Sequence, residues 1–100
     1  MCENEILKTV ISRSGNLKAV VFNRGCGAIT GFNTQISIIN TSEELESEGG
    51  NLFIADGTLP LGIHWDSNTS ISISGSESSN IYKKEFSFNG ITIAYESQEK

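Results

Sequence analysis

The chain has 100 residues, which is the length of one domain, so we expect a single domain over residues 1–100. Its net charge is −5 and its seven Lys and Arg residues are scattered, which excludes a general surface for nucleic acid phosphates. No apolar run reaches the roughly 18 residues of a transmembrane helix. The acidic balance favours solubility, or docking to a basic surface of a partner.

The first half of the chain carries three predicted strands. Residues 5–13 and 17–24 are rich in β-branched side chains and flank the turn residues 14–16, so they predict a hairpin. Residues 32–39 alternate, with Asn33, Gln35 and Ser37 on one side and mainly apolar residues on the other. This alternation predicts a strand with one buried face and one face in solvent.

Residues 40–51 break the strand pattern. Thr41 followed by Glu44 resembles a capping box, which favours a single helical turn that Gly49 and Gly50 would end. The alternative interpretation is an acidic surface loop, and we prefer it.

The second half of the chain predicts further short strands. Residues 52–56 are apolar, and residues 61–66 and 69–74 flank the turn residues Ser67 and Asn68. Residues 81–88 and 91–95 flank Asn89-Gly90, the dipeptide that favours a type I′ hairpin turn. The fold class is therefore all-β: a small antiparallel sandwich or barrel-like sheet of seven or eight strands, with at most one short helical turn.

The period-two pattern also predicts the core, although strands with apolar residues on both faces leave the register open. The predicted core residues are Ile6 or Leu7, Val10 or Ile11, Val20, Phe22, Phe32, Ile36, Ile38, Phe53, Trp65, Ile71, Phe86, Ile91 and Ile93.

The glycine-rich segment 24–31 does not match a phosphate-binding loop. Its glycines are followed by no lysine, and the next predicted element is a strand instead of a helix. Cys26 as a nucleophile would need His64, oriented by Asp56 or Asp66, and nothing in the sequence brings them together. Two cysteines and one histidine match no structural zinc spacing. We therefore predict no catalytic, cofactor-binding or metal-binding residue.

The same segment is better suited to shaping a corner. Three glycines within seven residues ease positive φ and close backbone approach. We expect the corner to turn Thr30, Asn33 and Gln35 toward solvent as hydrogen-bonding groups for contact with a partner.

The two cysteines are predicted to form a disulfide. In a hairpin centred on Gly15, residues pair where their numbers sum to about 30, which puts Cys26 opposite position 4 and near Cys2. Such a bond would stabilise the fold by about 3 kcal/mol in the chain-entropy model and would imply an oxidising compartment. The alternative is two free thiols in a cytosolic protein.

The glycine-rich corner and its flanking segments resemble a family of small uncharacterised bacterial proteins with the pattern Cys-Gly-Ala-Thr-Thr-Gly-Phe-x-Thr-Gln-x-Ser-Ile. Ile29 stands where the pattern has threonine. Matching residues are Cys26, Gly27, Ala28, Thr30, Gly31, Phe32, Thr34, Gln35, Ser37 and Ile38, then Gly50, Asn51, Phe53 and Ile54, and later Lys83, Lys84 and Glu85. The resemblance implies an exported domain, often anchored by a membrane segment that precedes a cysteine near the position of Cys2. It implies no known activity, cofactor or ligand.

Two functional hypotheses follow. The first is a non-enzymatic extracytoplasmic β-domain that is structural or binds another macromolecule at the bacterial envelope, with another protein as the expected partner. The second is a small acidic cytoplasmic inhibitor or immunity-type protein, phage- or plasmid-borne, that masks a basic site on a target protein, suggested by the acidic residues 43–48. No signal peptide is visible, so the chain is either cytoplasmic or begins after an export segment. We expect no nucleic acid, no cofactor and no small-molecule substrate, and a membrane contact only through an N-terminal anchor outside this chain.

Overall fold

A computed structural model describes residues 3–25, 32–45, 49–78 and 80–96 of the chain. These residues form nine strands and no helix, which confirms the all-β prediction. The strands are β1 (Glu3–Ile11), β2 (Leu17–Gly25), β3 (Phe32–Asn40), β4 (Phe53–Asp56), β5 (Gly62–Ser67), β6 (Ser70–Ser74), β7 (Ile81–Lys84), β8 (Ser87–Phe88) and β9 (Ile91–Glu96). No helix of the described residues is long and apolar enough to cross a membrane.

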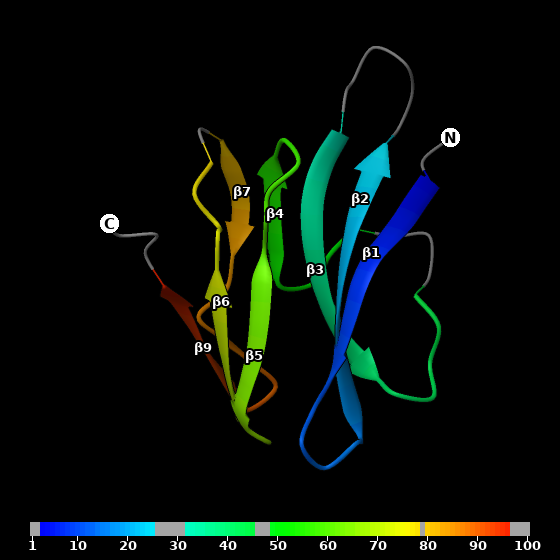
Figure 1. Cartoon of the computed structure of the whole chain (residues 1–100), viewed down its shortest axis with the longest axis vertical. Coiled ribbons are helices and arrows are strands. Elements are labelled where there is room, and N and C mark those ends of the chain that lie inside the picture. Colours follow the sequence, from blue (N-terminus) through cyan, green and yellow to red (C-terminus); the bar gives the residue numbers. More distant parts are fainter. Residues whose placement is uncertain (1–2, 26–31, 46–48, 79, 97–100) are drawn as a thin grey trace.

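The strands make two sheets that lie face to face (Figure 1). The five-stranded sheet has the order β1-β2-β3-β4-β7, and all of its neighbours are antiparallel. The four-stranded sheet has the order β5-β6-β9-β8, with a parallel pair between β6 and β9. The sheets do not close into a barrel, so the sandwich alternative is the correct one.

The first hairpin forms as predicted, but its register differs. Gly15 has a φ of +84°, and the backbone N–H of Ser12 donates to the carbonyl of Leu17 across the turn. Paired residue numbers sum to 29 near the turn and to 28 at the open end, because the register shifts between Ile6 and Lys8. The predicted sum of about 30 is therefore wrong, and a bulge in β1 is the reason for the further shift.

The predicted strand over residues 81–88 is divided between the two sheets. β7 pairs with β4 and β8 pairs with β9, and the chain changes sheet at Glu85 and Phe86. The N–H of Glu85 donates to the carbonyl of Leu52, whereas the carbonyl of Phe86 accepts from the N–H of Ile93. Asn89 and Gly90 have φ of +49° and +82°, which confirms the type I′ turn. This division raises the strand count to nine.

The core lies between the two sheets. It consists of Ala19, Val21, Ile36, Ile38, Leu52, Phe53, Ala55, Leu61, Trp65, Ile71, Ile73, Ile91 and Ile93. Most of the predicted core is confirmed, including Val20 and Phe22, which are buried on the opposite face of β2. The side chain of Phe32 lies outside the described part of the chain.

Two parts of the core prediction are wrong. Ile6 is 55% exposed and Leu7 is 44% exposed, because β1 is the edge strand of its sheet, so neither of these alternatives is in the core. Of the alternatives Val10 and Ile11, Val10 packs on the core and Ile11 is exposed. Phe86 is 62% exposed, because it lies where the chain passes from one sheet to the other.

On the outer face of the five-stranded sheet, the polar residues of β3 are covered, which the alternating sequence of β3 did not predict. Gln35 and Ser37 are only 3% exposed. The chain from β3 to β4 returns across this face, where the N–H of Gly50 donates to Gln35 and that of Asn51 to Ser37 (Figure 1). No helical turn forms in residues 40–45, where Glu43 Oε1 accepts from the N–H of Asn40.

Candidate functional site

The predicted partner-contact residues do not form one solvent-facing group. Thr30 lies outside the described residues, as do Cys2 and Cys26. Gln35 Oε1 accepts from Gly50 N at 2.6 Å, and its Nε2 donates to Asn33 Oδ1 at 2.6 Å. The prediction that Gln35 faces solvent is therefore wrong: the side chain fastens the returning chain to the sheet. A contact role for the half-buried Asn33 stays a prediction.

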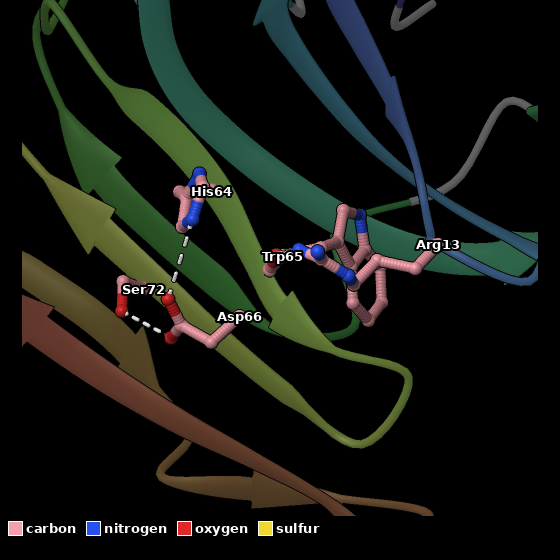
Figure 2. Close-up of polar contacts among 5 residues, drawn as sticks. All are labelled: Arg13, His64, Trp65, Asp66 and Ser72. Atoms are coloured by element: carbon pink, nitrogen blue, oxygen red, sulfur yellow. Dashed lines mark hydrogen bonds and ion pairs between the residues drawn. The ribbon is translucent and has the colours of Figure 1, made fainter.

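The only histidine lies in a polar cluster on the outer face of the four-stranded sheet. His64 and Asp66 share one side of β5, because alternate residues of a strand point the same way. His64 Nε2 lies 3.6 Å from Asp66 Oδ1, and Ser72 of β6 donates to Asp66 Oδ2 at 2.5 Å (Figure 2). Asp56 lies elsewhere: its carboxylate accepts from Tyr82 and Asn80.

The order of this cluster differs from that of a catalytic triad. In a triad the imidazole accepts the proton of the hydroxyl, and the carboxylate orients the imidazole from its far side. Here the carboxylate of Asp66 stands between the other two groups. The side chains of His64 and Asp66 are 73% and 42% exposed, so water competes for their contacts. In the described part of the chain, no group of three His, Cys, Asp or Glu residues could hold a metal ion.

Edge strand β1 is tied to the four-stranded sheet by long-range hydrogen bonds. The buried Trp65 donates from Nε1 to the carbonyl of Val10 at 3.0 Å. Arg13 donates to the carbonyl of Trp65, and Figure 2 shows these two side chains side by side. Lys8 Nζ donates to the carbonyl of Leu61. Together with the bulge near Leu7, these contacts interrupt the edge that β1 could offer to another strand.

The other edge of the five-stranded sheet carries exposed side chains of β7 and of Phe86, and the half-buried ring of Tyr95 in β9 packs against Phe86. We define the β7 patch as Ile81, Tyr82, Lys84, Phe86 and Tyr95. Tyr82 is 64% exposed and Phe86 is 62% exposed. The rings of Phe86 and Tyr95 are 5.3 Å apart and nearly perpendicular, and Lys84 Nζ lies 4.7 Å from the centre of the Tyr95 ring. The patch therefore has two exposed rings, Tyr82 and Phe86, and the ring of Phe86 is held against that of Tyr95.

Hydrogen bonds hold the two tyrosine hydroxyls of this patch. Tyr95 donates to the carbonyl of Glu85 at 2.6 Å, and burial, with the nearby Glu85 carboxylate, raises the pKa of Tyr95 to about 12. Tyr82 donates to Asp56 Oδ2 at 2.9 Å, and this bond to a carboxylate raises the pKa of Tyr82. Both hydroxyls therefore lose their protons at a higher pH than an ordinary tyrosine does.

A cleft of about 450 Å³ lies at one end of the sandwich, and we call it the end cleft. Strand ends and turns from both sheets line it: Leu17, Ile38, Ile39, Asn40, Glu43, Asn51, Asn68, Thr69, Phe88, Asn89 and Ile91. Its apolar side chains come from both sheets, and most of its polar groups are amides. The sequence pattern predicts neither feature. The end cleft joins residues far apart in the chain, and the period-two pattern places Phe86 of the β7 patch in the core.

Comparison of the chain with protein-family models, with curated proteins and with solved structures gave no match.

Proposed function

We propose that the protein is a non-enzymatic domain that binds another protein at the bacterial envelope, and that the β7 patch is its contact surface. The observation that carries this proposal is the exposure of two fixed aromatic side chains, Tyr82 and Phe86, on one edge of the sandwich.

The chemistry of the patch supports a protein partner. Tyrosine and phenylalanine are enriched at protein interfaces, where large rings bury much area with few rotatable bonds. Here Tyr82 is held by Asp56, and Phe86 packs edge-to-face on Tyr95. A partner would therefore order these side chains at little entropic cost.

A location outside the cytoplasm is the second part of the proposal, and it rests on a disulfide between Cys2 and Cys26. The β1–β2 ladder ends with Glu3 opposite Gly25. In the sequence, Cys2 directly precedes Glu3 and Cys26 directly follows Gly25. Neighbouring positions at the end of an antiparallel ladder are within the usual reach of a disulfide. The resemblance to an exported bacterial family points the same way.

The protein-binding role is tested with a double variant of the β7 patch. The natural chain, Tyr82→Ala/Phe86→Ala and the control His64→Ala are each used to capture proteins from the native host. We expect one partner to bind the natural chain and His64→Ala equally, and the double variant at least tenfold more weakly. All three chains should unfold at similar temperatures, because the exchanged side chains are exposed. A partner retained by the folded double variant would contradict the proposed surface.

The disulfide is tested on the non-reduced protein. Mass spectrometry should show the loss of about 2 Da, and reduction should lower the melting temperature by several degrees. Alkylation of both thiols in the air-exposed native protein would exclude the bond and remove the main support for an extracytoplasmic location.

A further inference from the structure

The end cleft has a chemistry that neither the β7 patch nor the proposed protein contact uses. Its volume of about 450 Å³ falls within the range of small-molecule sites. Its walls come from the β5–β6 turn, the β8–β9 turn and the ends of β2 and β3. Turns at one end of a β-sandwich, positioned by rigid strands, are where such folds often carry binding residues.

Part of the amide lining builds the walls of the cleft. Asn51 Oδ1 accepts from the N–H of Ile38, and Asn51 Nδ2 donates to the carbonyl of the same residue. Asn68 Oδ1 accepts from the N–H of Ser14 at 2.7 Å, which joins the turns of the two sheets. These bonds fix the shape of the cleft before any ligand arrives.

Another part of the lining is available to a ligand. Asn40, Thr69 and Asn89 are exposed. Within the described residues, none of their side-chain amides or hydroxyls makes a hydrogen bond. An amide both donates and accepts, and so does a hydroxyl, so these groups suit a ligand whose groups also do both.

The charge and the apolar surface of the cleft further limit the class of ligand that it can bind. Among the described residues, the lining contains no Lys, Arg or His, which disfavours an anion. The single carboxylate among these lining residues, Glu43, already accepts from the N–H of Asn40. Ile38 and Ile91 are buried beneath the cleft, and Phe88 is half-buried at its wall. The complementary ligand is thus uncharged, has an apolar face and carries several hydroxyls.

We propose that the end cleft binds a neutral carbohydrate, with Phe88 against an apolar face of a sugar ring and Asn40, Thr69 and Asn89 bonded to its hydroxyls. An extended peptide fits less well, because it would pair with the side of a strand and the cleft opens at strand ends and turns.

The test is an NMR titration of the full-length protein with maltohexaose, cellohexaose, xylohexaose and chitin hexasaccharide at millimolar concentrations. We expect at least one of them to shift the backbone signals of Thr69, Phe88 and Asn89 in a saturable way. Phe88→Ala should weaken that binding at least tenfold, and His64→Ala, an exposed side chain outside the lining, should leave it unchanged. Phe88→Leu serves in place of Phe88→Ala if the smaller side chain prevents folding.

Asn89→Asp provides the most closely matched variant. Asp-Gly supports the same type I′ turn as Asn-Gly, so the fold is kept while the amide donor is lost. We expect severalfold weaker binding of the same oligosaccharide. The proposal is overturned if no oligosaccharide of the panel gives saturable shifts, if Phe88→Leu and Asn89→Asp bind as tightly as the natural chain, or if an uncharged capped peptide alone shifts these signals.

Discussion

The two sheets turn very different faces to the outside, although similar alternating sequences build both. In the five-stranded sheet, Gln35 and Ser37 are buried beneath the chain that leads from β3 to β4. In the four-stranded sheet, His64, Asp66 and Thr92 point outward from the same kind of pattern and are exposed. Alternation therefore shows which side of a strand is polar. Whether that side is exposed to water depends on whether another segment of the chain packs over it.

Because one face is covered and the other is open to water, hydrogen bonds of similar length contribute differently to stability on the two faces. The bond from Gly50 to Gln35 measures 2.6 Å and that from Ser72 to Asp66 measures 2.5 Å. Removing the buried acceptor leaves an N–H without water, whereas removing the exposed one leaves a hydroxyl that water satisfies. Similar bond lengths thus do not imply similar contributions to stability.

The largest expected effect tests whether the covered face is a second core. Phe22 is fully buried on that face, so Phe22→Ala should lower the free energy of unfolding by about 3–5 kcal/mol. Its control is His64→Ala on the open face, which should change the free energy by no more than about 0.5 kcal/mol. Urea unfolding measures both, and similar midpoints for the two variants would contradict the contrast between the faces.

A smaller effect is expected where the returning chain touches the sheet. A Cβ on Gly50 would lie 2.7 Å from the carbonyl oxygen of Ile36, a backbone atom that cannot move freely. Gly50→Ala should therefore cost about 1–3 kcal/mol. At the adjacent Gly49 the nearest atom would be 3.7 Å away, so Gly49→Ala should lie between no change and a gain of about 1 kcal/mol. A higher melting temperature for Gly50→Ala than for Gly49→Ala would contradict the close approach of the Ile36 carbonyl to Gly50.

Some of these features could be predicted from the sequence, and others could not. Strand positions, the turn at Gly15 and the type I′ turn at Asn89-Gly90 were predictable, because local composition encodes them. The covering of Gln35, the bulge near Leu7 and the sheet change at Glu85 were not, because each depends on contacts between residues distant in sequence. The exposure of Phe86 was missed because the period-two pattern placed it in the core. That pattern does not show that the chain changes sheet at this point.

The inward side of the four-stranded sheet should be shielded from water, as the covered face is. Tyr95 lies on this inward side, and the pH dependence of its ionisation and of the protein's stability tests how well it is shielded. Its pKa is raised from the ordinary value of 10.0 to about 12, so the folded protein keeps the proton that the unfolded chain releases. The corresponding stability is complete below pH 10 and declines as the pH rises from 10 to 12. Absorbance at 295 nm should show late ionisation in Tyr82→Phe, where Tyr95 is the only tyrosine left. In Tyr95→Phe, the free energy of unfolding should decline less between pH 10 and pH 12. If Tyr95 in folded Tyr82→Phe ionises with a titration midpoint near pH 10, its burial is contradicted.

The smallest effect is expected on the open face, where Asp66 contacts both His64 and Ser72 but stays accessible to water. Asp66→Asn removes the charge opposite His64 but keeps an oxygen that can accept from Ser72. Asp66→Ala removes both contacts. Because the side chain of Asp66 is 42% exposed and that of His64 is 73% exposed, water replaces either contact, and both variants should stay within about 0.5 kcal/mol of the natural chain. A loss above about 2 kcal/mol for Asp66→Ala, restored in Asp66→Asn, would show that the bond from Ser72 is as important here as the bond of Gly50 to Gln35, and the contrast between the two faces would then fail.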